Sequence, residues 1–273
     1  LLFVLACGLS VTLGLMNFVN LAHGAFAMAG GYVTVVLVNS YGVPFLACLP
    51  IAFLVAAAIG LVLERTLYRR LYDKTHLDQV LFSIGLVFMA MASVDYFMGA
   101  RQQLIQLPDF LRGQFHFGDA ASVGVYRLFI IAICAALAIA LQLILSKTRF
   151  GSRLRAAVDD APAARGLGIN VGLVFAATFA FGSGLAGLGG ALGIEILGLD
   201  PSFPLKFMIY FLIVVVVGGT SSIAGPFVAS LILGIGDVAG KYYIPEFGSF
   251  MIYTIMVVIL VIRPQGLFAT RGA

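Results

Sequence analysis

Apolar residues run along the chain in long stretches that short polar or glycine-rich segments separate. The stretches are residues 1–15, 24–38, 45–63, 80–98, 125–145, 171–192, 207–236 and 247–262. A helix crossing the ~30 Å hydrocarbon core of a bilayer needs about 20 residues, and its backbone amides must be paired within the segment. The pattern therefore predicts an all-α, polytopic transmembrane bundle in a single domain, residues 1–273, with about 8–9 membrane segments, some of them interrupted.

The stretch 207–236 has two interpretations. It contains no charged residue, but the segment GGTSSIAGP at 218–226 interrupts it. One long tilted helix is possible, and so are two short helices around a glycine and serine turn. Two spans would place Arg263 and Arg271 on the side of the membrane that carries the other basic residues, so we favour two.

Composition and charge support a membrane location. Apolar residues make up 62% of the chain and charged residues 10%, whereas soluble domains have about 45–50% and about 25%. The loops between 45–63 and 80–98 and between 125–145 and 171–192 hold nine of the sixteen Lys and Arg residues. The positive-inside rule places both loops in the cytoplasm and the loop 99–124 outside. The net charge of +4 is thus a topology signal, and nucleic acid is excluded as a partner.

Polar residues between the first two stretches form a candidate solute pathway. Asn17, Asn20 and His23 lie within an apolar context, and an interrupted helix lining a cavity would present such groups. Asn17 and Asn20 are three residues apart, so we expect them to share a helical face. A polar turn at the membrane surface remains an alternative, and a lone histidine is more often a structural hydrogen-bonding residue than a ligand.

A glycine pattern in the sixth stretch matches the residues of a dinucleotide-binding motif but not the structural context that the motif requires. Gly182, Gly184 and Gly187 fit GxGxxG, but the context is an apolar helix with no acidic residue about 20 positions on. Gly182, Ala186 and Gly190 instead form a stripe of small residues, which allows helix backbones to approach closely in membranes. We expect a packing face, within the chain or against a second subunit.

The cytoplasmic loop 146–170 is long and mixes acidic with basic residues. Residues 150–158 alternate basic and apolar positions, which favours a short surface helix. Pro162 suits the first turn of a second short helix, with Asp160 near its start and Gly166 or Gly168 at its end. The loop could contact anionic lipid head groups or dock a cytoplasmic partner, and its mixed charge favours a protein.

Other chemistry has weak support. Asp95 and Glu195 lie within apolar stretches and deserve a functional hypothesis, but carboxylates are few for an ion-coupled carrier. The sequence contains no GxxxxGK[ST] segment, so it does not predict ATP binding by a P-loop.

Several further segments stand out when they are taken together: LGLMNFVNLAHG at 13–24, RAAVDD at 155–160 with ARGLGIN at 164–170, GGTSSIAGP at 218–226 and RPQGLF at 263–268. In this order they resemble the H-type subunit of the branched-chain amino acid ABC permease family. The resemblance spans nearly the whole chain. Thr220 departs from the small residue that the family often has, and Pro162 could shift the coupling helix by one or two positions.

The resemblance implies a multi-pass permease subunit in the bacterial inner membrane that imports branched-chain or related apolar amino acids by alternating access. Its partners would be a second homologous permease, two cytoplasmic ATPase subunits that hold the ATP and Mg, a periplasmic solute-binding protein and the lipid bilayer. No cofactor, metal or catalytic residue is expected on this chain.

The resemblance also implies two sets of site residues. The solute pathway would use Asn17, Asn20, His23, Gly219, Thr220 and Ser221. Coupling to the ATPases would use Arg149, Arg155, Asp159, Asp160, Arg165 and Gly168. An importer of urea or short amides from the same family and an ion-coupled secondary transporter stay open as alternatives.

Overall fold

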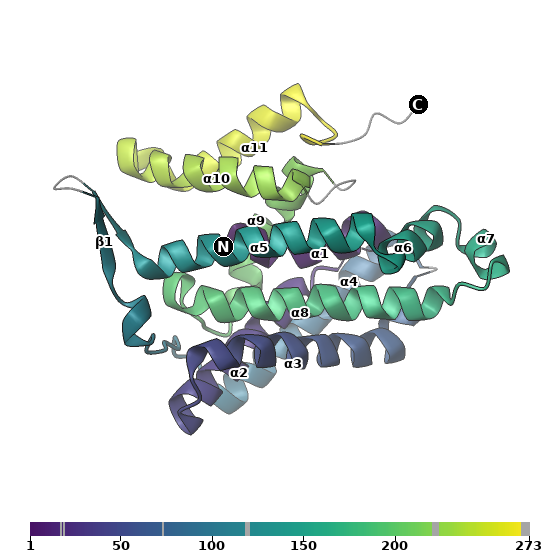
Figure 1. Cartoon of the computed structure of the whole chain (residues 1–273), viewed down its shortest axis with the longest axis horizontal. Coiled ribbons are helices and arrows are strands. Elements are labelled where there is room, and N and C mark those ends of the chain that lie inside the picture. Colours follow the sequence, from purple (N-terminus) through teal and green to yellow (C-terminus); the bar gives the residue numbers. More distant parts are fainter. Residues whose placement is uncertain (17, 19, 73, 118–120, 220–223, 269–273) are drawn as a thin grey trace.

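The computed structural model describes residues 1–273 except 17, 19, 73, 118–120, 220–223 and 269–273. Figure 1 shows a bundle of long helices, with α10 and α11 as a separate layer beside α5 and α1. The α-helices are α1 (Leu2–Met16), α2 (His23–Tyr41), α3 (Phe45–Thr66), α4 (His76–Met98), α5 (Val125–Lys147), α6 (Arg149–Asp159), α7 (Ala161–Gly166), α8 (Val171–Leu197), α9 (Phe203–Gly218), α10 (Ala224–Tyr243) and α11 (Met251–Ile262). The described residues also form three short 3₁₀ helices, η1 (Tyr68–Arg70), η2 (Asp109–Leu111) and η3 (Pro245–Phe250).

Each predicted apolar stretch contains an α-helix, which confirms the all-α membrane bundle. Within the described residues, six helices are long and apolar enough to cross a membrane, and three shorter apolar helices accompany them. Helix α4 begins earlier than the apolar pattern indicated. Thr75 and Asp78 form a capping box that fixes its first turn, with the Asp78 amide donating to Thr75 Oγ1 at 3.2 Å.

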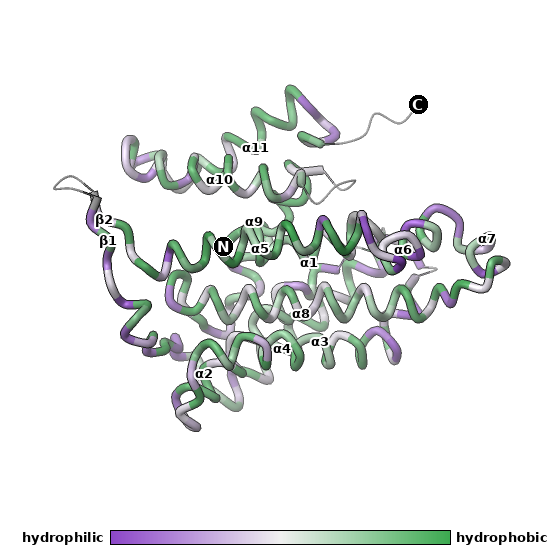
Figure 2. The backbone as a smooth tube through the Cα atoms, in the orientation of Figure 1, coloured by the Kyte–Doolittle hydropathy of each residue, from purple (hydrophilic) through white to green (hydrophobic). Residues whose placement is uncertain are grey.

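Polar residues gather at the two ends of the bundle, as Figure 2 shows. We call the end formed by η1, α6 and α7 the basic end. The opposite end carries the hairpin of β1 (Gln114–Phe117) and β2 (Ala121–Gly124), which are antiparallel. The sequence did not predict this hairpin. The loop before it is tied to the bundle where the Gln103 amide donates to the Leu199 carbonyl at 2.7 Å.

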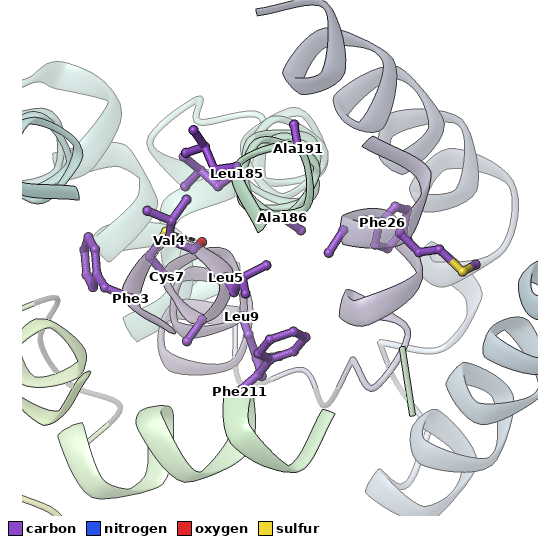
Figure 3. Close-up of a cluster of buried hydrophobic side chains, with 14 of the residues drawn as sticks. Phe3, Val4, Leu5, Cys7, Leu9, Phe26, Leu185, Ala186, Ala191 and Phe211 are labelled. Atoms are coloured by element: carbon purple, nitrogen blue, oxygen red, sulfur yellow. Dashed lines mark hydrogen bonds between the residues drawn. The ribbon is translucent and has the colours of Figure 1, made fainter. Parts of the chain in front are cut away.

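Helix α8 is the centre of the bundle because its small residues allow other helices to approach its backbone. A β-carbon placed on Gly190 would lie less than 3.0 Å from the Ala27 carbonyl of α2, and one on Gly8 of α1 would meet the Gly182 carbonyl equally closely. Figure 3 shows the apolar side chains of α1 filling the space between α8, α2 and α9. The small-residue stripe is therefore a packing face within the chain.

The stretch 207–236 forms two helices, α9 and α10, as we favoured. Their ends meet closely, since a β-carbon on Gly225 would lie less than 3.0 Å from the Gly218 carbonyl. The C-terminal segment closes this junction, because the Leu267 amide donates to the Val217 carbonyl at 2.8 Å and Gly266, with φ +85°, lies against Gly219. Two of the segments that carry the family resemblance thus contact each other.

Replacement of Gly190 by alanine tests the close approach of α2 and α8. The added methyl group would overlap the Ala27 carbonyl, and overpacking of this kind costs about 1–3 kcal/mol. We expect Gly190→Ala to lower the thermal unfolding midpoint of the detergent-purified protein by several degrees.

Gly85→Ala in α4 is the matched control, because no described heavy atom lies within 4 Å of that β-carbon position. Its midpoint should stay the same or rise, since alanine is the better helix former. Equal midpoints for the two variants would show that α2 and α8 do not need this approach.

Candidate functional site

The chain between α1 and α2 leaves the helical conformation at the point where the sequence predicted an interruption. Helix α1 ends at Met16 and α2 begins at His23, and Phe18 and Asn20 lie between them in non-helical backbone. We call residues 16–22 the break. The predicted helical face shared by Asn17 and Asn20 is wrong, because Asn20 is not in a helix; Asn17 lies outside the described residues. The Asn20 side chain accepts a hydrogen bond from the backbone amide of Ala22. Asparagine side chains often form such local bonds in place of helical hydrogen bonds.

Asn20 holds the break inside the bundle. Its side chain is buried, and its Oδ1 accepts hydrogen bonds from the Ala22 amide at 3.1 Å and from the Tyr68 hydroxyl at 3.0 Å. The Leu21 amide donates to Ser83 Oγ of α4 at 3.2 Å. These bonds take the place of helical ones, as buried non-helical backbone requires.

The other predicted pathway residues occupy different places. His23 is buried at the start of α2, with its Nε2 2.8 Å from the Leu5 carbonyl and its ring 6.0 Å from that of Phe211. Gly219 follows α9 in a left-handed conformation, φ +86°, about 12 Å along the helix from Phe211. Thr220 and Ser221 lie outside the described residues. The structure therefore brings Asn20 and His23 together but leaves Gly219 apart from them.

A polar cavity of about 560 Å³ lies at the basic end, between the break and the loop 146–170. We call it the basic-end cavity. Met16 and Phe18 of the break form one side, and Ala161 and Arg165 of α7 form another. Its wall also contains Glu64 near the end of α3, Arg69 of η1, Tyr72, and residues at the starts of α4 and α8. One space therefore joins the two segments that the sequence singled out.

Glu64 is the buried acid of this cavity. Its side chain is 1% exposed, and its Oε1 accepts a hydrogen bond from the Tyr72 hydroxyl at 3.0 Å. Its Oε2 has no hydrogen-bond partner among the described residues, and Arg65 Nε is 3.8 Å away, too far for a hydrogen bond. Burial, and then the charge of Glu64, raise the pKa of Tyr72 well above its usual value. The Tyr72 hydroxyl therefore stays protonated and remains a donor to Glu64 at neutral pH.

The loop 146–170 folds as two short helices, α6 and α7, which confirms the pattern-based prediction. Thr148 caps α6, its Oγ1 accepting from the Gly151 amide at 3.3 Å. Asp160 caps α7, its Oδ1 accepting from the Ala163 amide at 2.9 Å. Leu154 and Ala164 are buried in a small apolar cluster with the start of α8, separate from the main core. The two helices thus have their own packing unit.

The predicted coupling residues all lie on the exposed surface of this unit. They are Arg149, Arg155, Asp159, Asp160, Arg165 and Gly168. Arg155 also donates to the Leu145 carbonyl at the end of α5. Leu167, between α7 and the left-handed Gly168, is 81% exposed at the tip.

The chain was compared with known proteins. A family model described as the branched-chain amino acid transport system permease component matches residues 1–260. The chain belongs to this permease family.

Curated relatives cover nearly the whole permease. The high-affinity branched-chain amino acid transport system permease protein BraD of Pseudomonas aeruginosa is 26% identical over 97% of this chain and 90% of its own. The probable branched-chain amino acid transport permease protein LivH of Methanocaldococcus jannaschii is 28% identical over 98% and 88%. LivM of Escherichia coli K12 is 27% identical over 97% and 67%. No solved structure matches.

The family assignment does not favour the ion-coupled transporter or the urea importer. An ion-coupled transporter would need buried carboxylates. Asp95 and Glu195 are both exposed, which also disfavours that mechanism. Sequence reasoning missed Glu64, Arg69, Tyr72 and Gln79, which line the basic-end cavity of the permease. One signal was available, because Glu64 directly follows the apolar stretch 45–63 as an acid within a basic segment.

Loss of the Tyr72 hydroxyl should destabilise the permease. In Tyr72→Phe the Glu64 carboxylate loses its hydrogen bond while it stays buried, which costs about 1–3 kcal/mol. We expect a lower thermal unfolding midpoint in detergent at neutral pH. Tyr96→Phe is the control, because Tyr96 is 84% exposed. If both variants unfold at the same temperature, the Tyr72–Glu64 bond does not support the fold.

Proposed function

We propose that this permease subunit imports branched-chain amino acids across the bacterial inner membrane as part of an ATP-driven ABC importer. The names of BraD and LivH support the solute class, and the match to both LivH and LivM supports pairing with a second homologous permease. Two cytoplasmic ATPase subunits would hold ATP and Mg, and a periplasmic binding protein would deliver the solute.

The basic-end cavity carries this proposal. Arg165 of α7 and Phe18 of the break line the same space, so a displacement of α7 changes the wall that the break also forms. Helices α6 and α7 pack with the start of α8 in one small cluster separate from the main core, so a displacement of the two helices would also act on α8. A motion received at the exposed surface around Leu167 can thereby reach the interrupted helix.

We assign the pathway to the break and the α9–α10 junction. Asn20 and His23 supply polar groups in the first, and Gly219 lies at the second, next to Gly266. Asn17, Thr220 and Ser221 belong to the same two segments and remain predicted pathway residues. Neutral polar groups in apolar surroundings suit an amino acid with an aliphatic side chain.

Charge reversal on α7 tests the coupling role. The complete importer would be reconstituted in liposomes, with binding protein outside, ATP and Mg inside, and labelled leucine uptake measured together with ATP hydrolysis. Arg165→Glu should reduce uptake about tenfold, equivalent to ~1.4 kcal/mol of coupling, while hydrolysis continues.

Arg153→Glu is the matched control, since Arg153 is exposed on α6 and does not line the cavity. Its uptake should remain near that of the unaltered importer. Equal uptake by Arg165→Glu and Arg153→Glu would contradict the coupling assignment. Uptake by this permease alone, driven by a proton or sodium gradient, would contradict the ATP-driven importer itself, and uptake of urea but not leucine would contradict the solute.

A further inference from the structure

The basic-end cavity combines charges of both signs with an apolar wall. Glu64 provides a carboxylate, Arg69 and Arg165 provide guanidinium groups, and Phe18 and Phe175 provide aromatic surface. Its volume of about 560 Å³ lies within the ~300–1,000 Å³ of small-molecule sites. The wall draws on several helices, so these groups converge on one space from separate parts of the chain.

The buried carboxylate is incompletely paired. Glu64 Oε2 has no hydrogen-bond donor among the described residues, although the side chain is 1% exposed. A buried charged oxygen without a donor is costly, so such a group in a native structure calls for a partner. Glu64 lines the cavity, and a ligand ammonium group that reaches Oε2 by displacing the side chains over it would supply that donor.

Aromatic rings line the same cavity as Glu64. Phe18 packs edge-to-face on Tyr72 at 5.5 Å, and Tyr72 packs on Phe175 at 5.7 Å. They give this part of the wall an apolar surface that suits an aliphatic group. A purely anionic ligand would meet the two arginines but would also face the charge of Glu64.

We propose that the basic-end cavity is a binding site for the free α-amino acid that the importer releases. The ammonium group pairs with Glu64, the carboxylate pairs with Arg69 and Arg165, and an aliphatic side chain lies against Phe18 and Phe175. This inference rests on the proposed function, because it takes the transported solute as the ligand. The proposed site is a second polar binding site for the solute, on the cytoplasmic side of the break, and α7 forms part of its wall.

Equilibrium binding with a series of ligands tests the site. The purified complete importer, without binding protein or nucleotide, would be titrated with radiolabelled leucine. Two competitors each lack one charge: 4-methylpentanoate has no ammonium group and 3-methylbutylamine has no carboxylate. We expect leucine to bind and neither competitor to displace it at equal concentration.

Variants then locate the binding. Glu64→Gln should weaken leucine binding by about tenfold or more, the effect of losing one charged hydrogen bond. Glu195→Gln is the matched control, because Glu195 is exposed and lies near the hairpin end of α8. Arg69→Met should also weaken binding, and it carries the test if Glu64→Gln fails to fold, since Arg69 is exposed.

Three outcomes would overturn the inference: no leucine binding, displacement of leucine by 4-methylpentanoate as effectively as by leucine, or unchanged binding in both Glu64→Gln and Arg69→Met. The second would show an anion site for a carboxylate or phosphate group. Leucine uptake by the same preparation, measured with binding protein and ATP, separates this test from that of the function. Uptake without this binding refutes the site alone, whereas absence of uptake refutes the importer.

Discussion

Backbone contact between α8 and its neighbours is the constraint on which the rest of the permease depends. In lipid, apolar side chains gain little by leaving the solvent, so helix association relies on close packing. Gly182, Gly187 and Gly190 allow this, because a β-carbon at each would lie within about 3.0 Å of α1, α3 or α2. Three helices thereby share one central helix, and the start of α2 is held at a depth where His23 reaches the backbone of α1. The break is a consequence of that arrangement, since the chain must return from the end of α1 to this depth over six residues.

Burial of the break requires that its polar groups find partners, and the partners determine its neighbours. Asn20 Oδ1 accepts hydrogen bonds from the Ala22 amide and the Tyr68 hydroxyl. Ser83 Oγ accepts a hydrogen bond from the Leu21 amide. The first turns of α4 and the residues of η1 are therefore fixed around the break by hydrogen bonds. The same region contains Glu64 and Tyr72, so the satisfied groups of the break and the incompletely paired carboxylate lie side by side at the basic end.

Local signals in the sequence predicted most of the helices. Apolar length gave the spans, the glycine and proline segment at 218–226 indicated two helices, and Asp160 with Pro162 indicated the start of α7. The predictions that failed, and the features that were missed, mostly depend on contacts between distant parts of the chain. The shared face of Asn17 and Asn20 assumed a continuing helix, but the Asn20 side chain bonds the local backbone and Tyr68, which is 48 residues away. The cavity around Glu64 was not predictable, because its wall comes from residues between Met16 and Phe175 that no short pattern connects. The β1–β2 hairpin was missed because four-residue strands in a loop give a weak periodic signal.

The positions of the acidic residues bear on whether an ion gradient drives transport. A carrier that uses an ion gradient needs carboxylates buried along the membrane path, yet Asp95 and Glu195 are exposed. Glu64 is buried, but it lies at the basic end, with Arg65 Nε 3.8 Å away and Arg69 lining the same cavity. Among the described residues, the acidic groups thus favour recognition at one end over ion passage through the middle. Helices α6 and α7 with the start of α8 form the small packing unit at that end, where Leu167 is exposed and Ala161 and Arg165 of α7 border the cavity. A force that a partner applied to the exposed surface of α7 would act on the cavity wall directly, because α7 forms part of that wall.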